Sequence, residues 1–409
     1  MHKLKLIAPE DFSGGKVVLE GSKSISNRVL IIRALSDSEF EVKNLSPSND
    51  TNTLNSLLSE KGNTLDAGAA GTTFRFLTAW LSRSNKRQIL LTGSERMKQR
   101  PIGILTNALK TLGADISYVE KEGYPPLLIS GKTLQGGPLK ISASVSSQYI
   151  SALLMIGPSL KDGLALTLEG KVGSRPYIEM TLRIMEHFGA KWSWKADTIY
   201  IEEGNYTAQL FTVEGDWSAA SYYYGLAAVV TQGNTIEVEG LNKLSLQGDS
   251  VLPSIYNKLG IQTVFTDSGI EITRTAAPDS IFEFDFSDCP DLAQTVVVTC
   301  AILGVKMRIN GLESLRIKET DRTAALSKEL ALFGIAFEDK GMGYWELEGK
   351  AEAPDQTGLI HTYEDHRMAM AFAPLSFAFG AISFEEPDVV RKSYPSFWED
   401  WQSLGFEIE

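Results

Sequence analysis

The chain has 409 residues, of which 43% are hydrophobic and 22% charged, and its formal net charge is −12. That length is enough for at least two hydrophobic cores, because a single core rarely grows beyond roughly 250–300 residues. The acidic balance argues against a sequence-independent grip on nucleic acid, so any anion-binding site must be local.

Metal-binding, disulfide and membrane signals are weak. The two cysteines, Cys289 and Cys300, have no paired spacing, and the four histidines are scattered. We therefore expect no zinc site, no other metal and no disulfide framework. The start, MHKLKLIAPEDF, lacks the apolar core of a signal peptide, and the longest uncharged stretch, 368–384, is shorter than the roughly 20 apolar residues of a membrane span. We expect a cytoplasmic protein without a membrane segment.

In chain order, six runs of small and apolar residues, each long enough for a helix, follow a polar cluster. They begin at Lys23 (KSISNRVLIIRAL), Ala70 (AGTTFRFLTAWL), Ser146 (SSQYISALLMI), Asp216 (DWSAASYYYGLAAVV), Pro290 (PDLAQTVVVTCAIL) and Asp365 (DHRMAMAFAPLSFAF). The free N–H groups and partial positive charge of a helix N-terminus favour anions. Six such starts, several with Ser, Thr, Lys or Arg, predict sites for small, multiply charged ligands.

A second kind of helix alternates with these runs and ends at a glycine. The five helix ends are TLGAD, HFGAK, KLGIQ, LFGIA and SLGFE, and their glycines lie 76, 71, 74 and 71 residues apart. Glycine is favoured after the last turn because only glycine takes a positive φ without cost. Four of these stops precede a predicted hairpin: ISYVEKEGYPPLLISG, KWSWKADTIYIEEG, IQTVFTDSGIEITR and IAFEDKGMGYWELEG.

The recurring block of about 70–75 residues predicts an α+β fold built from about six α/β-type layer units. The first unit is short, since KGNTLDAG leads directly to the next apolar helix and leaves no room for a hairpin. Six units divide most simply into two domains. Crossovers near Gly21 and Gly215 predict one domain of residues 1–21 with 216–409 and another of residues 22–215.

Cationic residues recur at the starts of these units. Ser24 and Arg28 lie four apart beside Lys23, and Lys318 and Arg322 lie four apart in RIKETDR. Further cations follow in ERMKQRP, DHRMAM and RKSYP, namely Arg96, Arg100, Arg367, Arg391 and Lys392. Any one of them alone is better explained as a solvated surface charge. Their recurrence at the same point of each unit indicates a shared anion-binding role.

The ordered motifs KSISNR, GTTFR, ERMKQRP, SSQYISALLM, SRPYI, PDLA, RIKETDR, DHRMAMAF and RKSYP resemble those of the 5-enolpyruvylshikimate-3-phosphate synthase family. The resemblance runs from about Lys23 to Pro395. It implies two domains, each of about three βαβαββ units, with the N-terminal strand joined to the C-terminal half and the ligands in the cleft between domains. It also implies transfer of the enolpyruvyl group from phosphoenolpyruvate to the 5-hydroxyl of shikimate 3-phosphate, without a cofactor and with glyphosate as inhibitor.

The resemblance also implies two ligand sets. Both substrates carry a phosphate and a carboxylate, and arginine binds such groups bidentately. Phosphoenolpyruvate would contact Lys23, Gly71, Arg96, Gln148, Arg322, Arg367 and Lys392. Shikimate 3-phosphate would contact Lys23, Ser24, Arg28, Ser146, Ser147, Gln148, Ser174, Tyr177, Asp291, Lys318 and Ser314, the last at a position where the family often has Asn.

The reaction needs a base near the 5-hydroxyl and an acid near the methylene carbon. Asp291 is the candidate base, with Lys23 sharing that role, and Glu319 is the candidate acid; the division among the three stays open. A carboxylate among so many cations should have a lowered pKa, which suits Asp291.

Three alternatives compete with this interpretation. A UDP-N-acetylglucosamine enolpyruvyl transferase shares the fold but uses a loop cysteine, which GSERMKQRP lacks. An RNA 3′-phosphate cyclase-like enzyme is disfavoured by the acidic balance, and an inactive repeat scaffold would not need the convergent cations. The expected partners are therefore the two small substrates, with no nucleic acid and no membrane, in a monomer.

Overall fold

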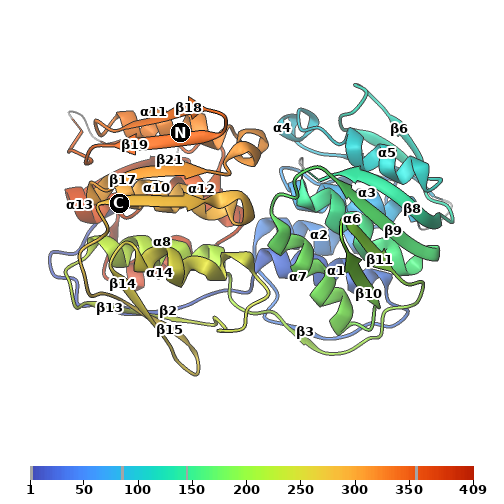
Figure 1. Cartoon of the computed structure of the whole chain (residues 1–409), viewed down its shortest axis with the longest axis horizontal. Coiled ribbons are helices and arrows are strands. Elements are labelled where there is room, and N and C mark those ends of the chain that lie inside the picture. The colour runs from blue at the N-terminus through green and yellow to red at the C-terminus, as the bar shows by residue number, and fades with distance from the viewer. Residues whose placement is uncertain (1–2, 84–86, 144–145, 355–357) are drawn as a thin grey trace. The chain divides into compact units, whose positions relative to one another are not determined.

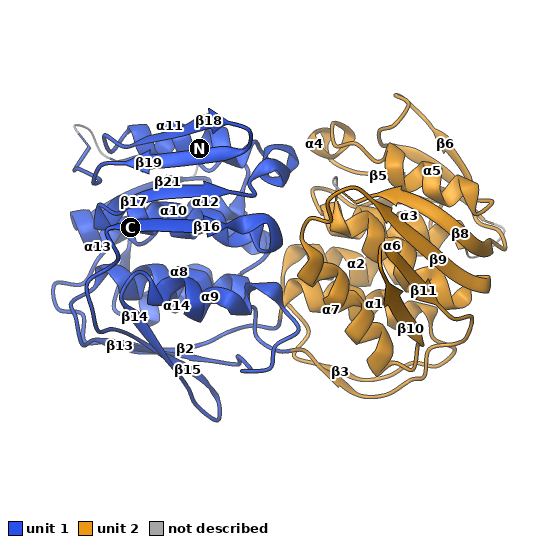
Figure 2. Ribbon diagram, in the orientation of Figure 1, with its two compact units in different colours: residues 1–21, 214–409 blue, residues 22–213 orange. Residues whose placement is uncertain are grey.

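The structure is a computed structural model that describes residues 3–83, 87–143, 146–354 and 358–409. Figure 1 traces the chain, and Figure 2 colours the two compact units into which the described residues divide. Unit 1 comprises residues 1–21 and 214–409, and unit 2 comprises residues 22–213. Gly21 and Gly215, where the sequence predicts the crossovers, are joined by an isolated antiparallel bridge.

Unit 1 contains three four-stranded sheets among its described residues. In the first, β1 (Lys3–Ile7) pairs antiparallel with β21 (Ala381–Glu385) and β22 (Glu407–Ile408), and β20 (Leu359–Ile360) lies parallel to β21. The N-terminal strand is thus built into a sheet of C-terminal segments. The orders of the other two are β14 (Ile261–Phe265), β15 (Gly269–Arg274), β13 (Thr235–Glu239), β2 (Gly15–Val18), and β16 (Ile281–Asp285), β17 (Lys306–Asn310), β19 (Tyr344–Glu348), β18 (Ala336–Gly341).

Unit 2 has two four-stranded sheets and one two-stranded sheet in its described part. The larger sheets have the orders β4 (Thr64–Asp66), β5 (Gln88–Thr92), β7 (Leu127–Ser130), β6 (Asp115–Tyr118), and β10 (Trp192–Lys195), β11 (Thr198–Ile201), β9 (Lys161–Glu169), β8 (Gln135–Ser142). The small sheet pairs β3 (Val42–Lys43) with β12 (Phe211–Thr212). The four hairpins predicted from the sequence all form, in both units.

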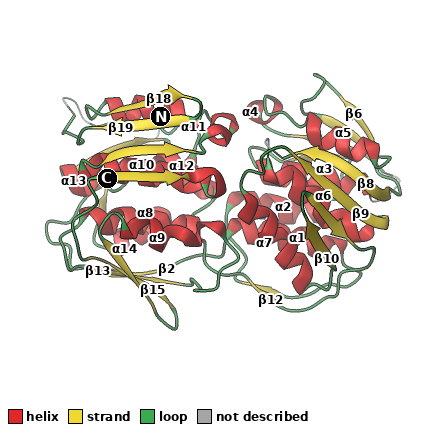
Figure 3. Cartoon of the chain, in the orientation of Figure 1, coloured by secondary structure: helices red, strands yellow, loops and turns green. Residues whose placement is uncertain are grey.

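The six apolar runs form the helices expected of them. In unit 2 they are α1 (Lys23–Leu35), α3 (Gly71–Arg83) and α6 (Ser147–Ile156), and in unit 1 they are α8 (Trp217–Val229), α10 (Ala293–Leu303) and α12 (His366–Phe372). The last run differs from the prediction, because Pro374, which has no N–H to donate, separates α12 from a second helix, α13 (Leu375–Phe379). Figure 3 shows how helices and strands are distributed within each unit.

The described residues form seven further α-helices. They are α2 (Asn49–Ser59), α4 (Glu95–Lys98), α5 (Gly103–Thr111) and α7 (Arg175–His187) in unit 2, and α9 (Leu252–Asn257), α11 (Arg322–Ala331) and α14 (Phe397–Ser403) in unit 1. The five predicted glycine stops follow α5, α7, α9, α11 and α14, and each glycine has a positive φ between 74° and 97°.

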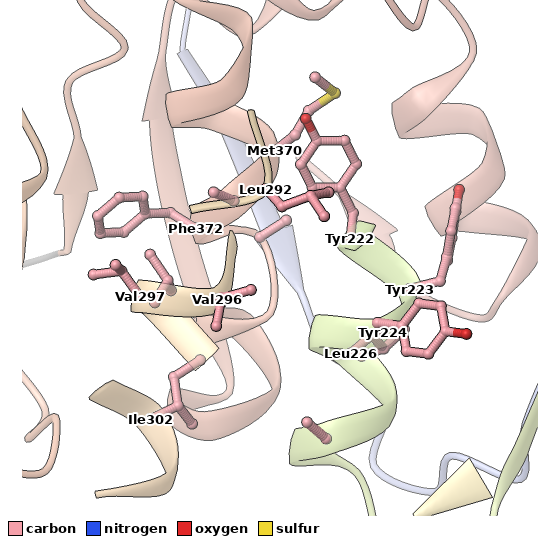
Figure 4. Close-up of a cluster of buried hydrophobic side chains, with 14 of the residues drawn as sticks. Tyr222, Tyr223, Tyr224, Leu226, Leu292, Val296, Val297, Ile302, Met370 and Phe372 are labelled. Carbon is pink, nitrogen blue, oxygen red and sulfur yellow. The ribbon is translucent and has the colours of Figure 1, made fainter. Parts of the chain in front are cut away.

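The core of unit 1 gathers around α8, α10 and α12. Figure 4 shows Tyr222 to Tyr224 of α8, Val296 and Val297 of α10, and Met370 and Phe372 of α12 in one cluster, and all of these side chains are buried. A helix that is apolar on all sides is stable only inside a core. Burial of these three helices fixes their N-termini, from which the polar residues of the next section extend.

The glycine stops yield a matched stability test. A Cβ at Gly260 would lie 2.2 Å from the carbonyl oxygen of Ala276, whereas a Cβ at Gly334 meets nothing within 4 Å, although both have positive φ. We expect Gly334→Ala to lower the free energy of unfolding by about 1–2 kcal/mol, the cost of a left-handed non-glycine residue. Gly260→Ala should lower it by roughly 3 kcal/mol or more, because backbone must also move. Urea unfolding of both variants measures the difference, and equal losses would contradict this account.

Candidate active site

Arg322 is the centre of an ion-pair cluster in unit 1. Its guanidinium is almost fully buried, with 2% of the side chain exposed, and donates to three carboxylates. The distances are 2.9 Å from Nη1 to Asp291 Oδ1, 3.0 Å from Nη2 to Glu319 Oε2 and 2.7 Å from Nε to Asp365 Oδ2. Burial opposes the charged guanidinium, but the three carboxylates together raise the pKa of Arg322 above its ordinary value.

Asp291 lies in the turn of 3-10 helix η4 (Pro290–Leu292) that precedes α10 and is contacted by cations from three elements. Besides Arg322, Lys318 Nζ lies 3.5 Å from Oδ1 and Arg367 Nη2 lies 3.2 Å from Oδ2. Burial alone would raise the pKa of the Asp291 carboxyl, but these cations, Arg367 foremost, hold it well below its usual range. The lowered pKa expected from the sequence is therefore found, and Asp291 is a carboxylate at neutral pH.

Glu319 and Lys392 extend the cluster. Glu319 Oε1 lies 3.1 Å from Lys392 Nζ, at the end of η6 (Pro387–Lys392), while Oε2 accepts from Arg322. Asp321, two residues on, caps α11 by accepting from the amides of Thr323 and Ala324. The KETDR motif thus places one acid on Arg322 and another on the helix start.

Asp365 was not among the predicted site residues. Its side chain is fully buried, and both of its oxygens accept from Arg322. It is also the N-cap of α12, where it accepts from the Arg367 amide at 2.9 Å. Arg367 in turn donates from Nη1 to Tyr222 at 3.3 Å. The DHR motif is a sequence signal for Asp365, because an acid that caps a helix next to a site arginine can also pair with another arginine of the site.

Asp249 is a second residue that the sequence did not reveal. It is buried in η2 (Gly248–Val251) and accepts from the Ser218 hydroxyl of α8. Burial, with the neighbouring charge of Asp291 adding to it, raises the pKa of Asp249 to about 7. No cation or motif adjoins it in the sequence, so only tertiary packing places it in this charged surrounding.

In unit 2, Lys23 stands at the start of α1 and pairs with an acid of α2. Its Nζ lies 3.4 Å from Asp50 Oδ2, and the Thr73 hydroxyl of α3 donates to the Asp50 carbonyl at 2.9 Å. The N-terminal turns of α1, α2 and α3 therefore meet at Asp50, which the sequence analysis did not single out.

Gly71 begins α3 beneath two guanidinium groups. A Cβ at this position would lie 2.5 Å from Arg100 Nη1 and 2.7 Å from Arg75 Nη1, so a larger residue would displace them. Gln148 of α6 donates to Thr72, also at the start of α3, at 2.9 Å. The start of α3 is thus lined by arginine on one side and by an amide on the other.

Arg28 holds three helices of unit 2 together from a buried position. Its guanidinium donates to the Ser24 carbonyl of α1 at 2.8 Å, to Ser151 of α6 at 3.2 Å and to Thr181 of α7 at 2.7 Å. Burial lowers the pKa of Arg28 to about 10. The same group also reaches the Tyr177 carbonyl at 3.4 Å.

The other predicted residues lie at helix starts or turns. Ser146 caps α6 and Ser147 begins it, Arg96 lies in α4, and Ser314 lies in η5 (Glu313–Ile317), four residues before Lys318. Ser174 precedes α7 with a left-handed φ of 53°, an uncommon conformation for serine. The structure therefore joins six of the predicted residues in unit 1 through Arg322 and Asp291, and it places those of unit 2 around the starts of α1, α3, α4, α6 and α7.

Two further features of the described residues bear on ligands. Among the described residues, no group of three or more His, Cys, Asp or Glu side chains is arranged to hold a metal ion. No helix in the described part combines the length and apolar character that crossing a bilayer requires.

Comparison with known proteins identifies the family. A model of the family described as EPSP synthase (3-phosphoshikimate 1-carboxyvinyltransferase) matches residues 9–63 and 53–401. The chain belongs to the EPSP synthase family. A 3-phosphoshikimate 1-carboxyvinyltransferase of Bacteroides fragilis (strain YCH46) is 49% identical over 96% of both sequences, and one of Shewanella pealeana is 35% identical over 99% of this chain and 100% of its own length.

A solved structure agrees on the fold. An EPSP synthase from Acinetobacter baumannii superimposes over the whole of both chains with a TM-score of 0.80 at 21% identity. The α+β fold of two multi-sheet domains, predicted from the repeats and the resemblance, is therefore that of EPSP synthase structures.

Asp249 yields a pH test of this chain. Between about pH 4 and pH 7 the folded chain keeps a proton on Asp249 that the unfolded chain has lost, so ionisation lowers stability as the pH rises through this range. We expect the stability of Asp249→Asn relative to the parent to increase from pH 4 to pH 7 and then to level off. Thermal unfolding at several pH values measures this. Asp267→Asn, at an exposed turn between β14 and β15, controls for loss of one carboxylate, and parallel curves for Asp249→Asn and the parent would contradict the prediction.

Proposed function

We propose that the chain transfers the enolpyruvyl group of phosphoenolpyruvate to the 5-hydroxyl of shikimate 3-phosphate, releasing phosphate and forming 5-enolpyruvylshikimate 3-phosphate. The observation that carries this is the cluster around Arg322, in a chain that belongs to the EPSP synthase family. In the reaction the 5-oxygen bonds to C2 while C3 gains a proton. The C2–O bond to phosphate then breaks as C3 loses a proton.

We assign phosphoenolpyruvate to the cations and to one close backbone approach. The residues are Lys23, Gly71, Arg96 and Gln148 of unit 2 and Arg322, Arg367 and Lys392 of unit 1. The ion pairs of these cations support the assignment, because Arg322, Arg367 and Lys392 each contact a carboxylate of the protein. A ligand that brings a carboxylate and a phosphate can replace such carboxylates as the counter-charge.

We assign shikimate 3-phosphate to the hydroxyl-rich helix starts and to the acid of η4. Lys23, Ser24, Ser146, Ser147, Gln148, Ser174 and Tyr177 belong to unit 2, and Asp291, Ser314 and Lys318 to unit 1. Arg28 joins this set in a supporting role, because its donors already hold Ser24, Ser151 and Thr181. Its burial at 2% exposure favours fixing the first turns of α1 and α7.

Asp291 is the proposed base, Lys23 assists it, and Glu319 is the proposed acid toward C3. A carboxylate surrounded by cations is ionised and ready to accept a proton, but it is a weak base while they remain on it. Substrate anions that draw Lys318, Arg322 and Arg367 away would make Asp291 more basic. Asp291 would then be most basic when both substrates are bound.

The reaction assay compares acceptors. Phosphate release should require both phosphoenolpyruvate and shikimate 3-phosphate, and UDP-N-acetylglucosamine should not replace the latter. Release from phosphoenolpyruvate with the UDP-sugar but not with shikimate 3-phosphate would support the sister enolpyruvyl transferase instead. We also propose a cytoplasmic enzyme that acts as a monomer, which light scattering with and without both substrates would test.

Replacing the base separates chemistry from binding. Asp291→Asn keeps the size and one acceptor oxygen, so both substrates should still bind while kcat falls at least about 100-fold, as for loss of a positioned acid or base. Steady-state kinetics with calorimetry of ligand binding measures both effects. Asp288→Asn, at an exposed position three residues earlier, is the matched control. Near-parental kcat for Asp291→Asn would remove Asp291 from catalysis.

Lys23 is assigned to both substrates, so its loss should affect both. Lys23→Met keeps the apolar stem, and we expect the KM for each substrate to rise about tenfold or more, the usual loss for a charged hydrogen bond. Lys43→Met, at an exposed position of β3, should leave both KM values near those of the parent. A rise for one substrate only would restrict Lys23 to that ligand.

A further inference from the structure

The turn that leads into α12 has an unfavourable backbone. The Asp365 amide donates to the Thr362 carbonyl at 2.9 Å, which closes a four-residue turn. Its two central residues, Tyr363 and Glu364, have φ values of 54° and 56°. Positive φ at both central positions is the pattern of a type I′ turn, which strongly favours Asn and Gly. A Tyr–Glu pair adopts it only where neighbouring contacts impose it.

Those contacts come from Glu329 of α11. This carboxylate is fully buried, and its two oxygens hold the turn at separate points. Oε2 accepts from the His361 amide at 3.1 Å, and Oε1 accepts from the Tyr363 hydroxyl. Both bonds fix residues on the N-terminal side of the turn.

The other side of the turn is held by the same helix. Arg322, seven residues before Glu329 and therefore two turns away on one face of α11, donates to Asp365 at 2.7 Å. The turn is thus fixed at His361 and Tyr363 by the carboxylate of Glu329. At Asp365 it is fixed by the guanidinium of Arg322. From Asp365 the chain continues directly into Arg367, which contacts Asp291.

We propose that Glu329 and Tyr363 are positioning residues for phosphoenolpyruvate binding. They hold the 363–364 turn in its left-handed conformation, so that Asp365 meets Arg322 and Arg367 meets Asp291. The inference rests on the proposed assignment of Arg322 and Arg367 to phosphoenolpyruvate. The two bonds of Glu329, to the His361 amide and to the Tyr363 hydroxyl, form a clamp on this turn. If the clamp opens, both central residues relax to negative φ, and the start of α12 shifts with them.

The decisive variants change the clamp and the strain separately. Tyr363→Phe removes only the hydroxyl and keeps the ring, over which Lys328 lies at 5.6 Å. Glu364→Gly removes the steric penalty of a positive φ at a side chain that is exposed. Glu364→Ala is the matched control, since it removes the same carboxylate but keeps a Cβ.

Two measurements are made on the full-length parent, on Tyr363→Phe, and on the two double variants that combine Tyr363→Phe with Glu364→Gly or with Glu364→Ala. Hydrogen–deuterium exchange at residues 361–365 reports on the turn itself, and the KM for phosphoenolpyruvate against that for shikimate 3-phosphate reports on the site. Tyr363→Phe should speed exchange and raise the KM for phosphoenolpyruvate about fivefold or more, with little change for shikimate 3-phosphate. Adding Glu364→Gly should restore both values toward those of the parent, and adding Glu364→Ala should not.

Several results would overturn the proposal. Unchanged exchange in Tyr363→Phe would mean that the bond from the Tyr363 hydroxyl to Glu329 does not hold the turn, and the proposed role of Tyr363 would fall. A lower melting temperature with both KM values unchanged would mean that the contact is merely structural. Equal effects of Gly and Ala would mean that backbone strain is not involved. Arg367→Ala is measured in parallel; if its KM for phosphoenolpyruvate is unchanged while Tyr363→Phe still alters exchange, the site assignment has failed and the clamp has not.

Discussion

A buried guanidinium with three carboxylate partners is the interaction on which unit 1 depends. Arg322 is shielded from water, and a buried charge is tolerated only when partners offset its desolvation. Those partners come from η4, from the segment before α11 and from the start of α12. The three carboxylates compensate this charge together, and each draws the segment that carries it toward the same side chain. Arg322 therefore fixes the start of α11 relative to η4 and to the start of α12. The same contacts fix Asp291 and Glu319, the proposed base and acid.

The carboxylates around Arg322 also explain how an acidic chain can bind acidic substrates. With a net charge of −12 the whole molecule would repel a phosphate, yet the cations near Asp291 and Glu319 are concentrated at one point. Protein acids neutralise them in the free enzyme, and substrate acids would do so in the complex. Exchange of one set of counter-charges for the other requires no net burial of unpaired charge. In the proposed reaction, this exchange would also make Asp291 most basic when both substrates are bound.

Much of the local structure followed from sequence pattern. Residues such as Val296 and Val297 lie in runs without a polar face, which predicted buried helices, and Gly260 and Gly334 ended helices where a positive φ was needed. Hairpins were visible from alternation around turn residues. The break at Pro374 was not predicted, because the run from Asp365 was interpreted as one helix although proline cannot donate within a helix.

The sequence by itself determined the order of helices and strands, the repeat, the family and which cations recur at the starts of the units, because periodicity, glycine stops and ordered motifs are local properties. Only the tertiary structure decided which charges meet. Asp50, Asp249 and Glu329 lie in segments without a distinctive motif, and each becomes informative only when another segment of the chain packs against it. Whether Arg28 faces a ligand or holds helices together is likewise a matter of burial, since desolvation and hydrogen-bond partners depend on residues more than a hundred positions away in the chain.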